Sequence, residues 1–432
     1  MEIVNKWRGR SLDDVAAFAR EASPLELCRS LHFLCGEHSA TFTHSLDLVA
    51  SHGLLSPQAR AMMSTGLVSK FCPPGFTNFP GDRDHTGSFW IDQVETVAME
   101  LAKRLFKVRY VELRPQSGAV ANEVTIAALC SRRDTIMAQS RFHGGHPSTR
   151  ESSYGGLMDL NYVDIPFNEQ DHAIDLDKAE ATISQTKPEL VVIGSAFIRF
   201  PYPVRELKRM AERVGSRILY DGAHALGLMA GSQYQNPITE GADVVTGSTQ
   251  KTLCGPIGGI IITNSGEVAR AVRDATNRFV CSYLNYSIGA LAVTFAEMLH
   301  FGLEYARNVV RNAQALASAL NEQGFTVLGK EQGFTQTHII LFDLKTDAEE
   351  AVRRLETAGI FATRKSSGRA PSCTGIRLGT TSVTRRGMGT REMNEIATFI
   401  RRILIDGEKP TQVAKNVADL AHAFNRVQYC FD

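Results

Sequence analysis

The chain has 432 residues, of which 43% are hydrophobic and 22% are charged, a composition typical of a soluble globular protein with more than one structural unit. Its 47 Lys and Arg residues nearly balance 46 Asp and Glu residues, so the formal net charge is +1. This balance gives no electrostatic case for binding nucleic acid or an anionic membrane surface.

Cysteine usage and the N-terminal stretch bear on the compartment. The eight cysteines form no CxxC pair, which favours free thiols in a reducing environment. The first residues show no apolar core followed by a small-residue cleavage site, and no uninterrupted apolar run reaches the length of a membrane span. We therefore expect a soluble cytoplasmic protein.

Residues 1–65 are predicted to form a helical arm, with one helix beginning near Ser11 and a second at Pro24. An arm of this size cannot bury a core by itself, so we expect it to pack on the main body or on a partner subunit. A loop rich in proline and glycine follows over 71–88, and long aromatic loops of this kind are more often functional than not. A helix with regularly spaced apolar residues is predicted over 88–106.

From Val108 onward, predicted strands and helices alternate. The strand candidates are 108–113, 134–139, 161–165, 190–196, 217–221, 243–246 and 257–263, with helices at 119–131, 175–186 and 204–214. This alternation predicts an α/β fold with a mostly parallel sheet covered by helices on both faces. In such sheets, ligands bind beyond the carboxyl ends of the strands, so the residues directly after each strand are functional candidates.

We predict two domains after the arm, a large one over 66–300 and a smaller α+β domain over 301–432. One or two long helices over 287–322 lead from the first to the second. The smaller domain is predicted to contain strands 338–343, 360–364 and 375–378 and helices 347–358, 390–405 and 411–424.

Lys251 follows one apolar strand, and Asp221 ends another, with His224 three residues further on. A lysine and an aspartate at the tips of neighbouring strands are what pyridoxal phosphate chemistry needs. The lysine forms a Schiff base with the cofactor, and the carboxylate keeps the pyridine nitrogen protonated. Taken singly, Lys251 would be interpreted as a solvated loop lysine and Asp221 as a turn or cap residue.

Other strand ends carry residues that suit the same cofactor. The turn Gln116-Ser117-Gly118-Ala119 opens a helix, where backbone N–H groups and the helix dipole favour a phosphate, although Ser at an N-cap is also common without a ligand. His143 and His146 are joined by no cluster of carboxylates or cysteines, so we predict no metal site; an imidazole stacked on a cofactor ring fits better. Ser195 and His224 could hydrogen-bond a phenolic oxygen of that ring.

Three arginines lie in the segment TGIRLGTTSVTRRGM. Arg377 stands within an apolar strand, where a guanidinium needs a partner; a substrate carboxylate or a structural salt bridge would each provide one. Arg385 and Arg386 are predicted to be surface or turn residues.

Five segments, PQSGAVAN, FHGGH, YDGAHALGLMAG, DVVTGSTQKTLCGPIGG and TGIRLGTTSVTRRGM, resemble in this order those of serine hydroxymethyltransferase, a pyridoxal phosphate enzyme of fold type I. The resemblance spans about Ser45 to Phe399. It implies catalytic roles for Lys251, Asp221 and His146, a carboxylate site at Arg377 and Ser51, and a cofactor site made of Ser117, Gly118, Ala119, His146, Ser195, Asp221, His224, Thr249, Gln250 and Lys251. It also implies a homodimer or a dimer of dimers.

The sequence departs from that family where the folate chemistry is expected. The family motif ASENY reads Ala50-Ser51-His52-Gly53-Leu54, and YAEGYPGKRYYGG is replaced by the loop that begins at Phe71. The glutamate that serves folate-dependent proton transfer and the paired tyrosines therefore have no counterpart, and Gln250 replaces the histidine beside the lysine. A general acid or base in place of the glutamate would come from His52, Asp84, His85 or His143.

The C-terminal third, with GFTQTHIILF, GIRLGTTSVTRRGM and the tail KPTQVAKNVADLAHAFNRVQYCFD, resembles the L-threonine transaldolases of natural-product pathways. Those enzymes cleave threonine to acetaldehyde and transfer the remaining glycyl unit to a second aldehyde. The leading hypothesis is thus aldol-type transfer between a small amino acid and an aldehyde. The alternatives are folate-dependent hydroxymethyl transfer, another reaction of the cofactor such as aminotransfer, racemisation or decarboxylation, and a binding role without catalysis.

Overall fold

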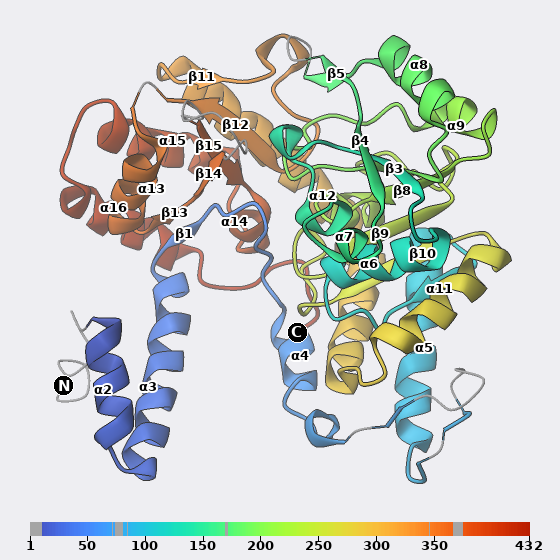
Figure 1. The fold of residues 1–432 in the computed structure, drawn as a ribbon. Helices are drawn as coiled ribbons and strands as arrows, with labels where there is room; N and C mark the ends of the chain where they lie inside the picture. Colours follow the sequence, from blue (N-terminus) through green and yellow to red (C-terminus); the bar gives the residue numbers. More distant parts are fainter. Residues whose placement is uncertain are drawn as a thin grey trace.

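The computed structural model describes residues 11–70, 72–73, 81–83, 85–168, 172–344, 346–365 and 375–432. Its centre is a seven-stranded sheet in the order β2-β10-β9-β8-β7-β3-β4 (Figure 1). The strands from β9 to β4 are parallel, and β10 runs antiparallel to β9 and β2, so the predicted mostly parallel sheet is confirmed. All seven predicted strands occur, as β2 (Tyr110–Glu112), β3 (Thr135–Ala138), β4 (Asn161–Asp164), β7 (Leu190–Ile193), β8 (Arg217–Asp221), β9 (Val244–Ser248) and β10 (Gly259–Thr263).

Helices cover both faces of this sheet, because successive strand side chains point to opposite sides. In β7, Val191 and Ile193 belong to one core and Leu190 and Val192 to another. The second core contains apolar residues of α6 (Gly118–Leu129) and α11 (Gly266–Phe279). The first contains residues of α5 (Phe89–Phe106), α8 (Leu176–Thr186), α9 (Val204–Glu212), α10 (Leu226–Ala230) and α12 (Asn285–Glu322).

A smaller unit surrounds a four-stranded antiparallel sheet of β11 (Thr326–Val327), β12 (Ile339–Asp343), β15 (Gly375–Gly379) and β14 (Thr363–Lys365). Helices α13 (Ala348–Thr357), α15 (Thr390–Leu404) and α16 (Pro410–Ala423) pack with it. Leu46 and Leu48 are buried in the same core, and β1 (Leu46–Asp47) pairs with β13 (Ile360–Phe361). A segment from the start of the chain therefore completes the core of the smaller unit. The domain boundaries at residues 66 and 301 remain predictions from the sequence.

Helix α12 connects the two units. Phe295, near its start, is buried in the core of the large sheet, and Leu316 and Leu320, near its end, are buried in the core of the smaller unit. Among the described residues it is the one helix long and apolar enough to cross a membrane by length and composition. Half of its most apolar stretch is buried inside the protein, and apolar side chains of this helix pack in both hydrophobic cores.

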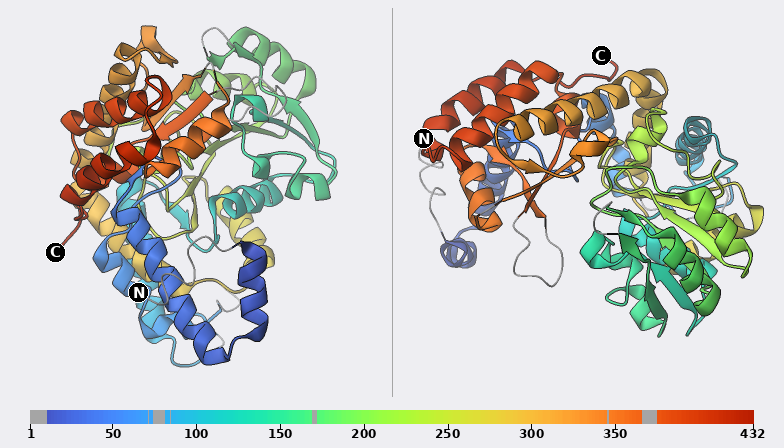
Figure 2. Two further views of the ribbon diagram at one scale, coloured as in Figure 1. Left: turned by 90° about the vertical axis from the view of Figure 1, so that its left-hand side faces the viewer. Right: turned by 90° about the horizontal axis from the view of Figure 1, so that it is seen from above.

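The N-terminal arm consists of α2 (Leu12–Glu21) and α3 (Pro24–Thr43), as predicted from Ser11 and Pro24. Each helix begins with a capping box, formed by Ser11 with Asp14 and by Ser23 with Glu26. Helix α2 buries no residue, α3 buries only Ser30, and both stand away from the rest of the molecule in Figures 1 and 2.

The prediction that Arg385 and Arg386 lie at the surface or in a turn is wrong for Arg385, while Arg386 lies in the turn after α14 (Thr381–Arg385) but is buried. Arg385 ends α14, is fully buried, and forms an ion pair with Glu297 of α12 at 2.9 Å. Arg386 is 7% exposed. Its guanidinium donates to the backbone carbonyl groups of Phe42, Thr43, Ser45, Ala421 and Phe424. The two arginines therefore tie the N- and C-terminal segments to the body of the protein, a role that no local pattern reveals.

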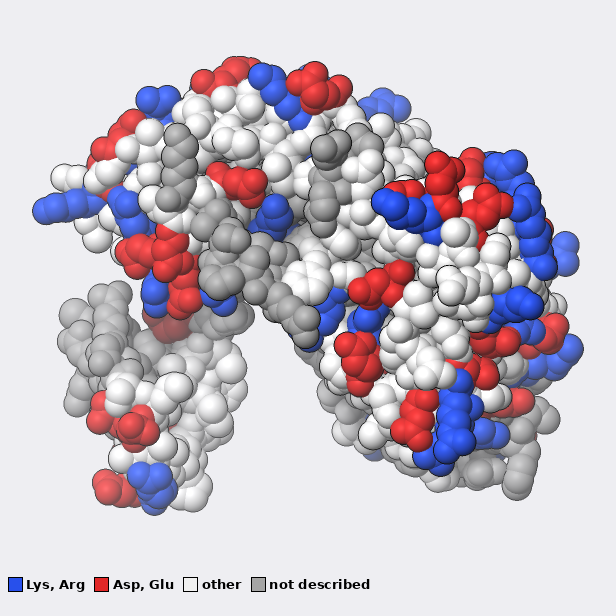
Figure 3. All heavy atoms as spheres, turned by 45° about the horizontal axis from the view of Figure 1, so that its top comes forward, with Lys and Arg blue, Asp and Glu red and all other residues white. Residues whose placement is uncertain are grey.

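The remaining elements are short. They are α4 (Pro57–Met62), η1 (Gly66–Ser69), η2 (Arg141–His143), η3 (Pro147–Thr149), α7 (Tyr154–Leu157), β5 (Phe167–Asn168), β6 (Ala173–Ile174) and η4 (Lys330–Gln332). On the face drawn in Figure 3, basic and acidic side chains are interspersed over both units.

Candidate active site

The structure brings five of the predicted residues into one pocket. His146, Ser195, Asp221, His224 and Lys251 line it together with Ala196 and Ala223. They follow β3, β7, β8 and β9, at the carboxyl ends of neighbouring parallel strands. This is the edge of the sheet at which the strand pattern predicted a ligand.

Asp221 is positioned by donors on both of its oxygens. The Asn122 amide donates to Oδ2 at 2.8 Å, and the Ala223 backbone N–H donates to Oδ1 at 3.0 Å. Asn122 in turn accepts a hydrogen bond from the Thr246 hydroxyl at 2.5 Å. Sequence reasoning missed Asn122; the available signal was an asparagine inside the apolar helix that follows Ser117, because a buried amide requires partners.

The same asparagine connects Asp221 to His146. The Asn122 amide also donates to the Ser148 hydroxyl at 2.9 Å, and this hydroxyl lies 2.7 Å from His146 Nδ1. The Ser148 backbone N–H donates to Nδ1 at 3.2 Å, so the neutral imidazole carries its proton on Nε2. His146 is exposed as a residue, yet desolvation lowers the pKa of its imidazole. The charge of Asp221 raises this pKa, and the charge of Lys251 lowers it further.

His224 rests on a second histidine that sequence reasoning also missed. The two rings are stacked with centroids 5.6 Å apart, and His224 Nδ1 lies 3.5 Å from His338 Nε2. His338 Nε2 donates to the Ala50 carbonyl at 2.9 Å, and burial lowers the pKa of His338 to about 3. Desolvation, followed by the charges of Lys251 and Arg377, lowers the pKa of His224 as well. Both rings are therefore neutral at physiological pH.

Ser195 is engaged within the protein. Its hydroxyl donates to the His143 carbonyl at 2.6 Å and accepts from the Phe197 backbone N–H at 2.9 Å. Gly144, with a φ of +84°, packs directly against the Ser195 hydroxyl. A larger residue would not fit, because a Cβ at position 144 would fall 2.2 Å from Ser195 Oγ.

Lys251 and Arg377 are two cations without a carboxylate in ion-pair contact among the described residues. Burial lowers the pKa of Lys251 to about 8. The negative charge of Asp221 partly offsets this lowering, and the positive charge of Arg377 adds to it. Arg377 donates to the Ala196 carbonyl at 2.9 Å and to the Thr363 hydroxyl at 3.2 Å, and burial lowers its pKa to about 10. The structural salt bridge considered for Arg377 is thus absent from this part of the protein, and its charge is available for a substrate carboxylate.

The phosphate turn lies at the start of α6. Ser117 caps this helix by accepting from the Val120 N–H at 3.1 Å. A Cβ at Gly118 would fall 2.2 Å from the Ser248 hydroxyl, so only glycine allows this approach. Ala119 lies in the first turn of the helix, and Asn122, one turn further on, bonds Asp221. The positive end of the dipole therefore points to the same region as the Lys251 pocket.

The residues next to Lys251 differ in their roles. The Thr249 hydroxyl is buried and donates to the Pro256 carbonyl at 2.6 Å, which stabilises the turn before the lysine. Gln250 Oε1 is buried and has no hydrogen-bond partner in the described residues. A glycine cradle at a helix N-terminus, which offers backbone N–H donors, a buried lysine and a carboxylate at a strand tip together fit the groups that pyridoxal phosphate requires.

The candidates for a replacement acid or base are separated in space. His52 lies outside the Lys251 pocket and pairs with Asp47 at 3.1 Å, which raises its pKa. His85 is exposed, and Asp84 lies outside the described residues. His143 lines a larger cavity that shares Ser195 with the Lys251 pocket. Ser51 is half-buried and directly follows Ala50. Ala50 lies against Gly379, at the end of the strand that carries Arg377: a Cβ added at Gly379 would fall 2.5 Å from the Ala50 Cα. Ser51 therefore lies near that strand.

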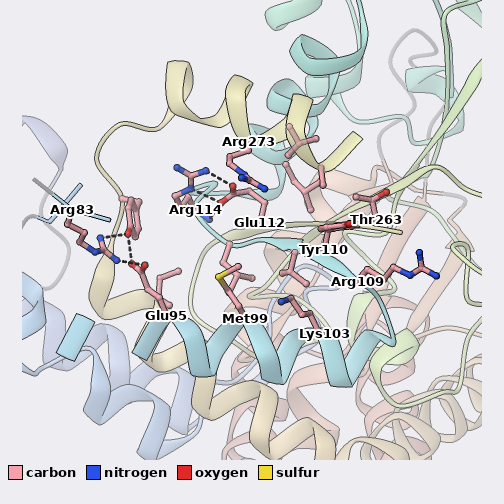
Figure 4. Close-up of a pocket in the computed structure, with 17 residues that line it drawn as sticks. Arg83, Glu95, Met99, Lys103, Arg109, Tyr110, Glu112, Arg114, Thr263 and Arg273 are labelled. Atoms are coloured by element: carbon pink, nitrogen blue, oxygen red, sulfur yellow. Dashed lines mark hydrogen bonds and ion pairs between the residues drawn. The ribbon is translucent and has the colours of Figure 1, made fainter. Parts of the chain in front are cut away.

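A separate cavity of about 270 Å³ lies at the β2 edge of the sheet, between α5 and α11 (Figure 4). Arg83 bridges Asp92 and Glu95 of α5 there and donates to the Tyr283 hydroxyl at 2.9 Å. None of the residues predicted for the cofactor lines this cavity. Arg83 instead secures the described end of the 71–88 loop, of which residues 71, 74–80 and 84 lie outside the described chain.

The lowered pKa of Lys251 predicts how the apoprotein takes up the cofactor. Only the neutral amine is nucleophilic, so the uptake rate should rise with pH up to about 8 and then level off. Stopped-flow absorbance over a pH series would measure this rate, with Lys251→Arg as the variant that forms no covalent link. A rate that keeps rising toward pH 10.5, the ordinary value of a lysine, would contradict the burial of this amine.

Known proteins are similar to this chain over most of its length. The sequence profile described as serine hydroxymethyltransferase matches residues 33–400. A serine hydroxymethyltransferase of Korarchaeum cryptofilum is 39% identical over 416 residues, covering 92% of this chain and 95% of that protein. One of Pyrococcus horikoshii is 36% identical over 415 residues, covering 93% and 96%.

Among solved structures, L-threonine transaldolase from Pseudomonas fluorescens in its internal aldimine state superposes with a TM-score of 0.87. Its sequence is 26% identical, and the match covers 94% of each chain. The chain therefore belongs to the serine hydroxymethyltransferase family and is a pyridoxal phosphate-dependent enzyme of fold type I.

Proposed function

We propose that this enzyme catalyses aldol-type transfer at the α-carbon of a small amino acid of the threonine, serine and glycine class. It would act as a transaldolase or aldolase that makes a β-hydroxy-α-amino acid. One observation carries the choice: Asp221 is the only carboxylate among the described residues that line the Lys251 pocket, and Asn122 and Ala223 already engage it. No second acid lines this pocket in the described part of the chain, in agreement with the altered motif at Phe71.

The residues of the pocket, and Arg377, which bonds the carbonyl of the pocket residue Ala196, have distinct tasks in this proposal. Arg377 binds the α-carboxylate, which fixes the rotation of the amino acid and so decides which bond at the α-carbon breaks. Asp221, held by Asn122, would hold the protonated pyridine nitrogen of the cofactor, and His146 would lie against its ring. Lys251, whose pKa is about 8, holds the cofactor between turnovers. Pyridoxal phosphate, when bound, accepts the electron pair of the bond that breaks at the α-carbon.

Proton transfer to and from the substrate hydroxyl needs one further group. Of the histidines considered from the sequence, His143 is the one that lines a cavity adjoining the Lys251 pocket. We assign it to this step, because His52 pairs with Asp47 outside the pocket.

Folate-dependent hydroxymethyl transfer is the second candidate. It is favoured by the 36–39% identity to archaeal proteins named serine hydroxymethyltransferase over more than 90% of the chain.

One pair of assays separates the candidates. The purified holoenzyme is mixed with L-threonine, and acetaldehyde is measured by a coupled dehydrogenase with and without an acceptor aldehyde; in parallel it is mixed with L-serine and tetrahydrofolate. We expect acetaldehyde from threonine, faster with an acceptor, together with a new amino acid in the chromatogram. Turnover of serine only in the presence of tetrahydrofolate would establish the second candidate instead, and release of a keto acid would establish aminotransfer.

We also propose a cytoplasmic homodimer or dimer of dimers. The arm supports this assembly, because Leu12, Leu25 and Leu31 are 87%, 60% and 62% exposed, although apolar side chains of a stable arm require burial. The double variant Leu25→Glu/Leu31→Glu should raise the dissociation constant of the dimer at least about 100-fold, since each buried leucine contributes about 1.5–3 kcal/mol.

Sedimentation velocity over a concentration series would measure this change. Arg29→Glu, on the same helix, is the control, because it removes no apolar side chain. A double variant that remains as dimeric as the wild type would exclude the arm from the interface.

A further inference from the structure

A large cavity adjoins the Lys251 pocket. It measures about 880 Å³ and lies between the loops after β3, β4 and β7 and the smaller sheet, from which Leu341 and Lys365 contribute. Ser195 lines both spaces, so the cavity begins where the pocket around Lys251 ends. Its volume is within the range of sites that bind small organic molecules.

Aromatic side chains form much of its wall. Five of them line it: Phe142, Phe167, Phe197, Phe200 and Tyr202. Phe167 is stacked on His143 with ring centroids 4.1 Å apart and an angle of 18° between the rings. A Cβ at Gly144 would fall 2.8 Å from the Phe197 ring, so this glycine lets Phe197 lie directly beside Ser195. Flat rings with fixed orientations suit a flat, apolar ligand.

Arg199 is the exception in this wall. Arg199 is 5% exposed. Its guanidinium donates one hydrogen bond of 3.4 Å, from Nη1 to the Phe334 carbonyl, and its central carbon lies 5.3 Å from the centroid of the Phe200 ring. No carboxylate of the described chain lies within ion-pair distance of it, and burial lowers its pKa to about 10. The Nε and Nη2 atoms of Arg199 donate to no group of the described residues.

Three other buried arginines are satisfied by protein groups. Arg385 pairs with Glu297, Arg150 pairs with Asp164 at 2.7 Å, and Arg386 donates to five backbone carbonyl groups. Among the described residues that line the cavity, Asp164 is bound by Arg150, and Lys365 pairs with Asp343 at 3.2 Å, so neither charge serves Arg199. Burying a guanidinium without an anion is costly, so its retention in a ligand-sized cavity indicates an anionic ligand.

We propose that this cavity binds the second aldehyde of the transfer, and that Arg199 selects an aldehyde with a flat apolar body and an anionic oxygen group at the end remote from the formyl carbon. The assignment of the ligand as an aldehyde rests on the proposed function. The formyl carbon would lie toward Ser195 and Lys251, and the anionic group would receive the free N–H donors of Arg199.

The reaction balances without an oxidant or a reductant. The Cα–Cβ bond of L-threonine breaks and releases acetaldehyde, and its hydroxyl gives up a proton. The electron pair left at Cα then forms a bond to the formyl carbon of the second aldehyde, whose oxygen takes up a proton. Threonine and an anionic aldehyde thus yield acetaldehyde and a β-hydroxy-α-amino acid that carries the anionic group.

Binding of unreactive alcohols tests the cavity independently of turnover. Calorimetry on the holoenzyme would compare para-(hydroxymethyl)benzoate with the neutral para-methylbenzyl alcohol. We expect the wild type to prefer the anion at least about 10-fold, the lower bound for one charge-assisted hydrogen bond, and Arg199→Gln to lose that preference. Lys365→Gln removes the same charge from the same cavity and should retain the preference, because Lys365 already has Asp343 as its partner.

Turnover tests the substrate class. The acceptors would be para-formylbenzoate, para-formylphenyl phosphate and the neutral para-tolualdehyde, and the ratio of kcat/KM values shows whether a carboxylate or a phosphate is preferred. Arg199→Gln should lower the anion-to-neutral ratio about 10- to 100-fold while acetaldehyde release from threonine without acceptor stays the same.

Two results would overturn the proposal: equal binding of the two alcohols by the wild type, or an unchanged preference in a folded Arg199→Gln protein. The first needs no variant, so a folding defect does not remove the test. Absence of acetaldehyde from wild-type enzyme would instead refute the proposed reaction, while calorimetry would still report the anion preference of the cavity.

Discussion

Replacing Asp221 by asparagine is expected to lower kcat/KM for the amino-acid substrate about 100- to 1,000-fold, the cost of removing a positioned charge from a reaction centre. The carboxylate stands at the tip of β8, with Asn122 on one oxygen and the Ala223 N–H on the other. An amide of nearly the same shape can accept only one of these two hydrogen bonds, and it cannot compensate the protonated pyridine nitrogen. Initial rates of acetaldehyde release from L-threonine would measure the loss.

A conservative variant separates charge from structure. Asp221→Glu keeps the negative charge and should retain more activity than Asp221→Asn, even though the longer side chain disturbs both hydrogen bonds. If Asp221→Asn stayed within about tenfold of the wild type, the carboxylate would not act on the cofactor, because a neutral amide would then suffice.

A variant of Asn122 tests the same hydrogen-bond network without changing a charged residue. Asn122→Ala removes the donor to Asp221 and the bond to Ser148 behind His146, yet touches neither charge. We expect a shift in the absorbance spectrum of the bound cofactor with a smaller loss of activity than Asp221→Asn causes, as a positioning role requires.

The variant Glu297→Ala should lower the free energy of unfolding by about 3–5 kcal/mol, because it leaves a buried arginine without its anion. The Arg385 side chain is 0% exposed and that of Glu297 is 1% exposed. Arg385 Nε also lies 3.4 Å from the Leu54 carbonyl, and its backbone carbonyl accepts from the Gln428 N–H at 2.7 Å. Loss of the ion pair therefore weakens contacts of both chain ends. Urea unfolding at a fixed protein concentration would measure the change.

Two further variants make this result specific. Glu304→Ala removes an exposed carboxylate from the same helix and should change stability by less than about 0.5 kcal/mol. Glu297→Gln keeps a hydrogen-bond acceptor for Arg385 and should cost less than Glu297→Ala. A loss below about 1 kcal/mol for Glu297→Ala would mean that water or a neighbouring group compensates the arginine.

Much of the fold could be predicted from the sequence, because its signals are local. The alternation of apolar strands with helices placed all seven strands of the large sheet, and Ser11 and Pro24 marked the starts of the two helices of the arm. Strand periodicity did not reveal that β10 runs against its neighbours, since strand direction depends on the path of the connections.

The candidate site divides in the same way. The sequence by itself determined that Lys251, Asp221, His146, Ser195 and His224 follow strands, and parallel strands bring such positions to one edge of a sheet. Only the tertiary structure decided which side chains support them: Asn122 and Asp221 are 99 residues apart, His224 and His338 are 114 apart, and Glu297 and Arg385 are 88 apart. The same holds for Arg199, because its lack of an ion pair with any carboxylate of the described residues depends on all the segments around it. Burial and pairing are properties of the packed interior, so no local pattern in the chain could have supplied them.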